Sequence, residues 1–152
     1  MSIGLLLYRE FDGGLRVLLA HLGGPFWASK DAHAWTVPKG LEETLDSDLL
    51  AVAEREFAEE MGRPAPPGPT IDLGIVKAGR KTNRIYARAA DFDASQILSN
   101  TFTLEWPPRS GKVEEFPEVD RAEWFPLDIA RTKLVKGMLP FLERLEAAIG
   151  EG

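Results

Sequence analysis

The sequence predicts an α/β (α+β) domain in which a mixed β-sheet lies between helices. Three observations predict it: short apolar runs come first, one long amphipathic helix follows near the middle, and further apolar runs precede a second helix at the end. This order favours one mixed sheet with helices on its two faces. The length of 152 residues suits one sizeable core, so we expect a single domain spanning residues 1–152.

The first two strands are expected to form a hairpin. Residues 3–9 (IGLLLYR) and 15–22 (LRVLLAHL) are apolar, and the FDGG between them contains a strong turn signal. A segment punctuated by glycine and proline, residues 23–35, is expected to be a loop. A brief strand at Trp35–Pro38 (WTVP) and a polar loop, KGLEETLDSD, then lead towards the central helix.

The central helix is the clearest element in the sequence. Its pattern, DSDLLAVAEREFAEEMG, offers Asp46, Ser47 and Asp48 as N-cap candidates, because short polar side chains accept hydrogen bonds from the first free backbone N–H groups. Gly62, followed by Pro64, is expected to end the helix.

The second half of the chain predicts three or more strands and a C-terminal helix. Residues 71–78 and 83–90 are expected to be strands around the turn GRKT. Residues 99–112 contain one more strand and a basic loop, and residues 122–126 (AEWFP) form a short strand. Residues 139–150 have the apolar spacing of an amphipathic helix.

Composition limits the class of partner. The formal charge of −6 argues against broad binding to nucleic acid or to an anionic membrane, although a metal or a local basic patch still allows a small anionic ligand. The absence of cysteine rules out disulfides and thiolate metal sites. No run approaches the roughly 20 apolar residues of a membrane span, and the N-terminus reads as a strand and not as a signal peptide. We therefore expect a cytoplasmic protein with a small-molecule substrate and no nucleic-acid or membrane partner.

Three glutamates lie close together on the central helix. Glu56, Glu59 and Glu60 are neighbours at helical spacing, and like charges so placed destabilise a helix by about 0.2–0.5 kcal/mol per pair. On a helical wheel these carboxylates lie beside the apolar stripe and not opposite it, which places them at the edge where helix and sheet meet. An ordinary solvated acidic face is one interpretation, and a bound cation is the other.

The run from Gly40 to Gly62 resembles the Nudix box, a motif written G-x5-E-x7-R-E-U-x-E-E-x-G-U with U apolar. The segment REFAEEMG matches at every fixed position, but the first half is atypical. One extra residue separates Gly40 from Arg55, Asp46 or Ser47 replaces the first glutamate, and the last apolar position is arginine. GLLLYR, GGPFWASKD, AWTVPKG, SNTFTLEWPPRSGK and EFPEVDRAEWF are also similar to a bacterial subgroup of predicted Nudix nucleotide pyrophosphohydrolases.

The resemblance implies a Nudix-type α/β/α sandwich and an activity. The expected reaction is hydrolysis of a pyrophosphate bond in a nucleoside diphosphate-linked compound, with Mg²⁺ as cofactor and Mn²⁺ as a possible substitute. The implied metal ligands are Glu56, Glu59, Glu60 and a backbone carbonyl at Gly40, and Glu59 also counts among the catalytic residues. Arg55 would orient the carboxylates through charge-assisted hydrogen bonds.

A general base is expected outside the motif, in a loop before the AEWF strand. Glu114, Glu115 and Glu118 are the candidates; Glu118 is favoured and Glu115 is second. If Glu118 is the base, Glu118→Gln should slow turnover more than it changes KM. A glutamate that is simply solvated is the alternative for each.

Substrate contacts are less specific. Lys39, Arg80, Lys81 and Arg109 are candidates for binding phosphates, and Trp27 is a candidate for stacking on a base. The alternatives are that the basic residues belong to ordinary charged turns and that Trp27 only packs in its loop. Trp35 and Trp124 are expected in the core, and His21 and His33 are left unassigned. A nucleoside triphosphate or a dinucleoside polyphosphate is the default substrate. The alternative function is a catalytically weakened Nudix-fold module that binds or senses a nucleotide, which the altered first half of the motif favours.

Overall fold

Seven strands form a mixed β-sheet at the centre of the molecule. The computed structural model describes residues 1–11, 13–43 and 48–150. The strands of the main sheet are β1 (Ser2–Phe11), β2 (Gly14–Leu22), β3 (Trp35–Thr36), β4 (Lys39–Leu41), β5 (Thr70–Ala78), β6 (Lys81–Ala89) and β9 (Val119–Pro126). Their order is β3-β2-β1-β6-β5, with β4 also paired to β1 and β9 to β2. Within the described residues, β1 and β6 are the one parallel pair of strands in this sheet, so the predicted mixed sheet is confirmed.

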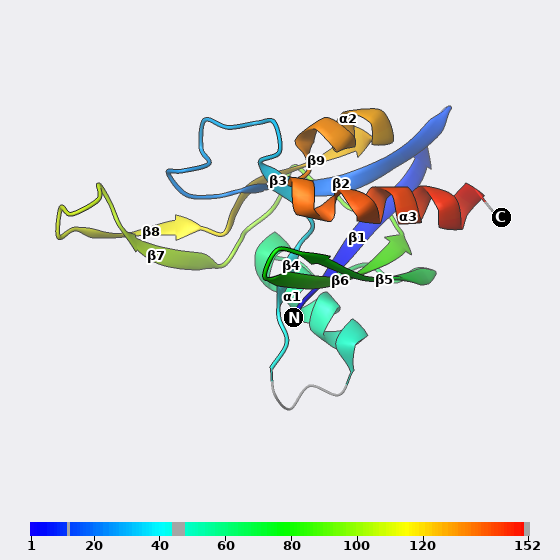
Figure 1. Cartoon of the computed structure of the whole chain (residues 1–152), viewed down its shortest axis with the longest axis horizontal. Helices are drawn as coiled ribbons and strands as arrows, with labels where there is room; N and C mark the ends of the chain where they lie inside the picture. The colour runs from blue at the N-terminus through cyan, green and yellow to red at the C-terminus, as the bar shows by residue number, and fades with distance from the viewer. Residues whose placement is uncertain (12, 44–47, 151–152) are drawn as a thin grey trace.

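Helices cover both faces of this sheet. Helix α1 (Leu49–Met61) lies on one face, and α2 (Leu127–Lys133), the 3₁₀ turn η1 (Lys136–Met138) and α3 (Leu139–Gly150) lie on the other, as Figure 1 shows. Each face has its own apolar core. Phe57 of α1 packs with Leu5 and Leu7 of β1, whereas Phe141 of α3 packs with Leu6 of the same strand. Alternate residues of β1 thus serve opposite cores, as strand geometry requires.

The sequence predicted the first hairpin and the central helix correctly. Strands β1 and β2 pair from Tyr8–Val17 to Phe11–Gly14 around the expected turn. Asp48 is the N-cap of α1, and its carboxylate accepts a hydrogen bond from the backbone N–H of Ala51 at 3.2 Å. Gly62 ends the helix with φ 81°, a conformation that favours glycine. The other two N-cap candidates, Asp46 and Ser47, lie outside the described residues.

Three expectations for the remaining segments are wrong. The brief strand predicted over residues 35–38 ends at Thr36, and the polar loop after it contains β4, which pairs with β1. Helix α2 was missed because seven residues are too few to show a helical period. Glu114 and Glu115 lie in strand β8 (Val113–Pro117) and not in a loop. Both faces of β8 are largely exposed, so the strand lacks the alternation of buried and exposed residues by which sequence reveals a strand.

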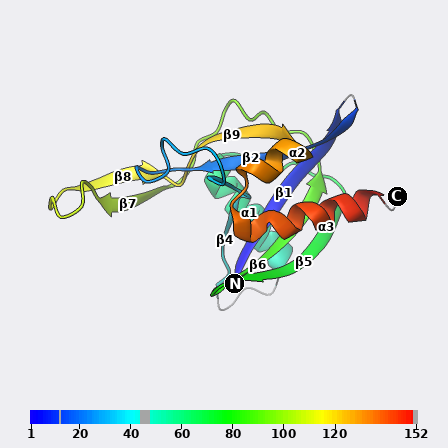
Figure 2. The same ribbon diagram turned by 45° about the horizontal axis from the view of Figure 1, so that its top comes forward.

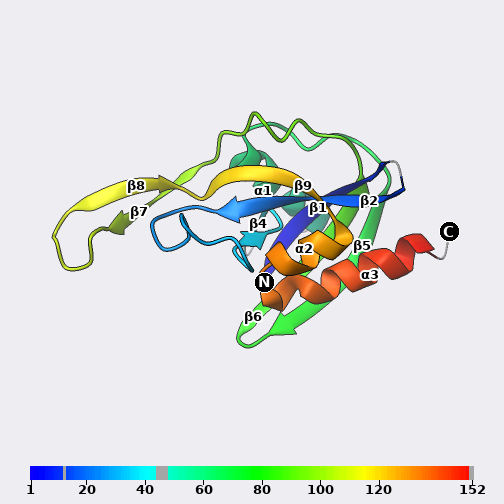
Figure 3. The ribbon, with the colours of Figure 1, turned by 90° about the horizontal axis from the view of Figure 1, so that it is seen from above.

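Strand β8 pairs with β7 (Thr101–Glu105) in a separate two-stranded sheet. We call residues 101–117 the arm, since this hairpin projects from the main sheet beside the loop that follows β2 (Figures 1 and 3). An edge-to-face contact between Phe26 of that loop and Trp106 of the arm, with ring centroids 5.1 Å apart, joins the two segments. The N-terminal end of β1, strand β4 and α1 lie side by side away from the tip of the arm, as the turned view shows (Figure 2). Among the helices described, none has both the length and the apolar character needed to cross a bilayer.

Candidate metal and phosphate site

A cavity of about 290 Å³ opens where α1 meets the ends of β1 and β4. We call it the carboxylate cavity. Two of the three helix glutamates, Glu56 and Glu60, line it together with Glu118. Its other walls are Ser2, Leu22, Thr36, Lys39, Gly40, Leu41, Asn100 and Val119.

The close approach of α1 to β4 places the glutamates there. Gly40 pairs with Ile3 of β1, and a Cβ atom at this position would lie 2.0 Å from Oε2 of Glu56. A neighbouring contact is also close, because a Cβ at Gly4 would lie 2.7 Å from the carbonyl oxygen of Pro38. Glycine at position 40 therefore lets the Glu56 carboxylate rest directly on the strand.

Glu60 is the most strongly perturbed carboxyl group of the cavity. Burial raises its pKa to about 8, and the nearby carboxylates of Glu118 and Glu56 act in the same direction. Lys39 opposes the rise through its charge and through its backbone N–H, which donates to Oε2 of Glu60 at 3.3 Å. Burial in turn lowers the pKa of the Lys39 ammonium, against the pull of Glu60 and Glu118. Glu60 is thus a carboxyl group whose ionised form needs more positive charge than the protein supplies.

Glu56 has a similar but smaller perturbation. Burial raises its pKa, and the adjacent carboxylate of Glu59 adds to the effect, while Arg55 opposes it. The guanidinium Nη2 of Arg55 lies 3.7 Å from Oε1 of Glu56, and the orienting role of Arg55 stays a prediction. Glu59 does not line the cavity: its side chain is exposed on the outer edge of α1, and its carbonyl accepts a hydrogen bond from the Asn100 N–H at 2.9 Å.

The backbone around Glu118 is fixed on both sides. Its N–H donates to the carbonyl of Asn100 at 2.9 Å, and its own carbonyl accepts from the N–H of Gly23 at 2.9 Å. A Cβ at Gly23 would lie 1.9 Å from the carbonyl oxygen of Pro117, so glycine allows this contact between loop and arm. Glu118 sits in the bend between β8 and β9, the loop position expected from the sequence. Two hydrogen bonds therefore hold this glutamate at the cavity wall.

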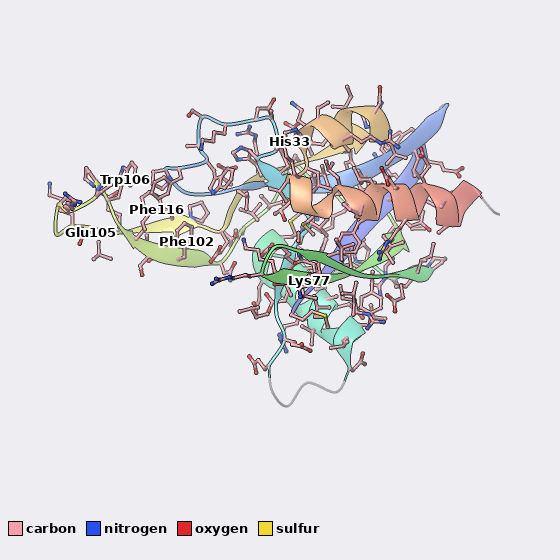
Figure 4. The ribbon with its side chains drawn as sticks, viewed as in Figure 1. His33, Lys77, Phe102, Glu105, Trp106 and Phe116 are labelled. Carbon is pink, nitrogen blue, oxygen red and sulfur yellow. The ribbon has the colours of Figure 1, made fainter. Side chains whose placement is uncertain are left out.

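The remaining candidates lie elsewhere. Glu115 is exposed on the arm, where it accepts a hydrogen bond from the Thr101 hydroxyl at 2.7 Å. Arg109 lies in the turn between β7 and β8, which follows Glu105 and Trp106, the two residues labelled near the tip of the arm in Figure 4, and Arg80 is exposed in the turn between β5 and β6. The structure thus places the favoured base beside the helix glutamates and its rival away from them.

Lys81 and Trp27 line a second cavity, which adjoins the first at Lys39. Sequence reasoning missed two side-chain amides at these cavities, Asn100 in the first and Asn83 in the second. Asn100 lies at the start of the stretch SNTFTLEWPPRSGK, to which the resemblance gave no role in the site. The sequence pattern could have pointed to Asn83. It is a polar residue in register with the apolar Ile85 and Ala87, which share its buried face of β6.

The donor set of the carboxylate cavity fits a hard divalent cation. Among the described residues, no three carboxylate or imidazole groups surround one point at ligand distance. Glu56 and Glu60 nevertheless face the same space as the Gly40 backbone, and all these donors are oxygens. Mg²⁺ is commonly held by one or two carboxylates, with waters and substrate phosphates completing its shell. The raised pKa of both glutamates is the mark of carboxylates that a cation would stabilise.

The fold and the acidic helix define a class of α/β/α proteins, and sequence comparison identifies it. A family model described as the NUDIX domain matches residues 1–145. The chain therefore belongs to the Nudix family. A search of curated proteins finds no match to this sequence.

Solved structures share the fold at low identity. The NUDIX domain of Shewanella oneidensis NrtR in complex with ADP ribose has a TM-score of 0.64 and 21% identity, over 97% of this chain and 86% of that chain. A binary complex of C. elegans Ap4A hydrolase gives 0.65 and 20%, over the whole of both chains. S. oneidensis NrtR with a 27-mer DNA gives 0.65 and 20%, but this chain covers 62% of it. These neighbours confirm the α/β/α fold, and the expectation of no nucleic-acid partner stays a prediction.

Proposed function

We propose that this protein is a metal-dependent Nudix hydrolase that cleaves a pyrophosphate bond in a nucleoside diphosphate-linked compound. The observation that carries the proposal is the convergence of Glu56, Glu60 and Glu118 on one cavity with Lys39 at its wall. Two structural neighbours are consistent with this class of substrate. NrtR was solved with ADP ribose, and the other neighbour is named an Ap4A hydrolase. A nucleoside triphosphate or a dinucleoside polyphosphate is the substrate we favour.

The charged residues of the cavity and two of their neighbours on α1 have roles in this proposal. Glu56 and Glu60, with Glu59 beside them and the Gly40 carbonyl, would hold Mg²⁺ or Mn²⁺, and Arg55 orients Glu56. The bound metal would neutralise phosphate charge and lower the pKa of the attacking water. Lys39 places an ammonium group beside the same anionic groups. Glu118 would accept the proton of the water that attacks phosphorus, because it lines the same cavity and two backbone hydrogen bonds hold it there.

The experiment that tests the proposal is a hydrolysis panel with matched variants. Purified protein is incubated with Mg²⁺ and then Mn²⁺ and with nucleoside triphosphates, dinucleoside polyphosphates and nucleotide sugars, and released phosphate and pyrophosphate are measured. Activity should require the metal and should be lost in Glu60→Gln. The control is Glu123→Gln, which removes an exposed carboxylate of β9 outside the cavity.

A sensing module is the second candidate, since the first half of the Nudix motif is altered. The neighbouring NrtR was solved both with ADP ribose and with DNA, which shows this fold in a protein that binds more than a nucleotide. Nucleotide binding without turnover of any compound in the panel would favour this function and reject hydrolysis.

A further inference from the structure

The second cavity has a different character from the carboxylate cavity. It has a volume of about 330 Å³ and shares Leu22, Thr36 and Lys39 with its neighbour, so the two spaces are continuous. Apolar side chains from four segments form most of its wall. Besides the shared Thr36 and Lys39, its polar residues are Asn83 and Lys81. The residues that line only this cavity are Trp27, Ala78, Lys81, Asn83, Val135, Gly137 and Met138.

Asn83 is a buried, neutral polar group of this cavity that lacks a hydrogen-bond partner among the described residues. Its residue is 5% exposed, yet its side-chain amide makes no hydrogen bond with any residue that the structure describes. Among the described residues, the polar side-chain atoms that are both fully enclosed and without a partner belong to Arg9 and Arg63. The Asn83 amide is not one of them, so it is accessible from the cavity that it lines. The other buried polar wall residue, Thr36, differs because its hydroxyl donates to Val37 and Met138. A buried amide without a partner costs free energy, which a ligand that bonds to it would recover.

The position of the cations sets the orientation of a ligand. Lys39 stands at the junction of the two cavities, and it faces Glu60 and Glu118 on one side and Lys81 on the other. An anionic group therefore belongs at this junction. Beyond it the wall includes Trp27, Val135 and Met138, whose apolar surfaces suit a neutral ring. A molecule that spans both cavities has phosphates at one end and a flat, uncharged heterocycle at the other.

We propose that the second cavity binds the nucleobase of the substrate and that Asn83 is a specificity-determining residue there. The proposal rests on the proposed function, because it assigns the ring of the nucleotide whose phosphates occupy the carboxylate cavity. An asparagine amide offers one acceptor and two donors, and so it pairs with a base edge that presents a donor beside an acceptor. Trp27 contributes an aromatic surface on which the ring stacks.

The sequence makes a direct test possible, since the chain has three side-chain amides: Asn83, Gln96 and Asn100. Their signals are followed by NMR in ¹⁵N-labelled protein with EDTA, while adenosine, guanosine, cytidine or uridine is added. Ribose 5-phosphate serves as the ligand without a base. At least one nucleoside should shift the Asn83 signal and leave that of the exposed Gln96 unchanged, and ribose 5-phosphate should not shift Asn83.

Variants then measure the contribution of the amide. Asn83→Leu and the smaller Asn83→Ala should weaken nucleoside binding by about tenfold or more, the loss expected for a good pair of hydrogen bonds to a base. Thr82→Val, on the opposite face of β6, should bind as the wild type does. A wild-type protein whose Asn83 signal no nucleoside shifts would overturn the proposal. Affinity kept within about twofold in both folded Asn83 variants would do the same.

Failure of this proposal and failure of the proposed function are separable. The NMR titration contains no metal and requires no turnover, so a base can bind in a protein that hydrolyses nothing. Conversely, metal-dependent hydrolysis with no response of Asn83 would leave the enzyme in place and place the base elsewhere.

Discussion

The carboxylate cavity and the arm carry the same kind of side chain in opposite environments. Glu60 and Glu118 line a cavity built on α1 and the main sheet, whereas Glu115 projects from a two-stranded hairpin into solvent. Burial raises the pKa of Glu60 to about 8, while the Glu115 carboxylate is exposed and bonded to Thr101. Chemistry at a carboxylate depends on desolvation and nearby charge, so position in the fold separates glutamates that look equivalent in sequence.

The largest expected effect is the loss of activity in Glu60→Gln. Removing this charge takes away a buried carboxylate that would hold the cation, and we expect kcat/KM to fall by about 10³-fold. Glu115→Gln, which makes the same chemical change on the arm, should stay within about twofold of the wild type. Steady-state kinetics on the best substrate of the panel measures both. Equal losses of kcat/KM in the two variants would show that a glutamate of the cavity contributes no more to catalysis than an exposed glutamate of the arm.

The next largest effect is expected at Glu118, the proposed general base. Glu118→Gln should lower kcat by about 10²-fold with little change in KM, because a base acts in the transition state and not in substrate binding. Glu114→Gln on the exposed face of β8 is the matched control. A loss in the Glu114 variant that matches or exceeds the loss at Glu118 would move the base onto the arm.

The comparison also shows what the sequence could reveal. The apolar runs of β1 and β2 and the cap residues Asp48 and Gly62 are local patterns, and each led to a correct element. Which of Glu115 and Glu118 lies at the cavity does not follow from the local sequence around them. It depends on the bonds that tie Glu118 to Asn100 and Gly23, residues far away in sequence. The same holds for Asn83, whose role follows from a cavity assembled by β3, β6 and η1.

A third effect concerns stability without metal. Because the folded-state pKa of Glu60, about 8, lies above the usual 4.5, its contribution to stability is fully present below pH 4.5 and is lost as the pH rises through 8. Glu60→Gln carries no charge to bury. In EDTA the variant should therefore match the wild type near pH 4.5 and exceed it by roughly 2–4 kcal/mol at pH 9.

Urea unfolding at the two pH values measures this difference. Mg²⁺ should stabilise the wild type at pH 8, because a ligand that binds only the folded state raises the free energy of unfolding, and it should stabilise the variant less. A wild type as stable as the variant at pH 9 would show that the Glu60 carboxylate is not desolvated as its position in the cavity indicates.

The smallest effect is expected at Gly40, where sterics and not charge are changed. A Cβ atom there would lie 2.0 Å from the Glu56 carboxylate oxygen, the end of a flexible side chain that can turn away. Gly40→Ala should therefore still fold, because the group that must move is a side-chain carboxylate and not the backbone. Activity should fall about tenfold, because a ligand displaced by an ångström binds its cation less well. The control is Gly14→Ala in β2, which, like Gly40→Ala, changes a strand glycine without a positive φ, but has open space around its Cβ and touches no carboxylate. If both alanine variants keep full activity while the protein remains metal-dependent, the cation is held by Glu60 and its neighbours without the Glu56 carboxylate that rests on β4.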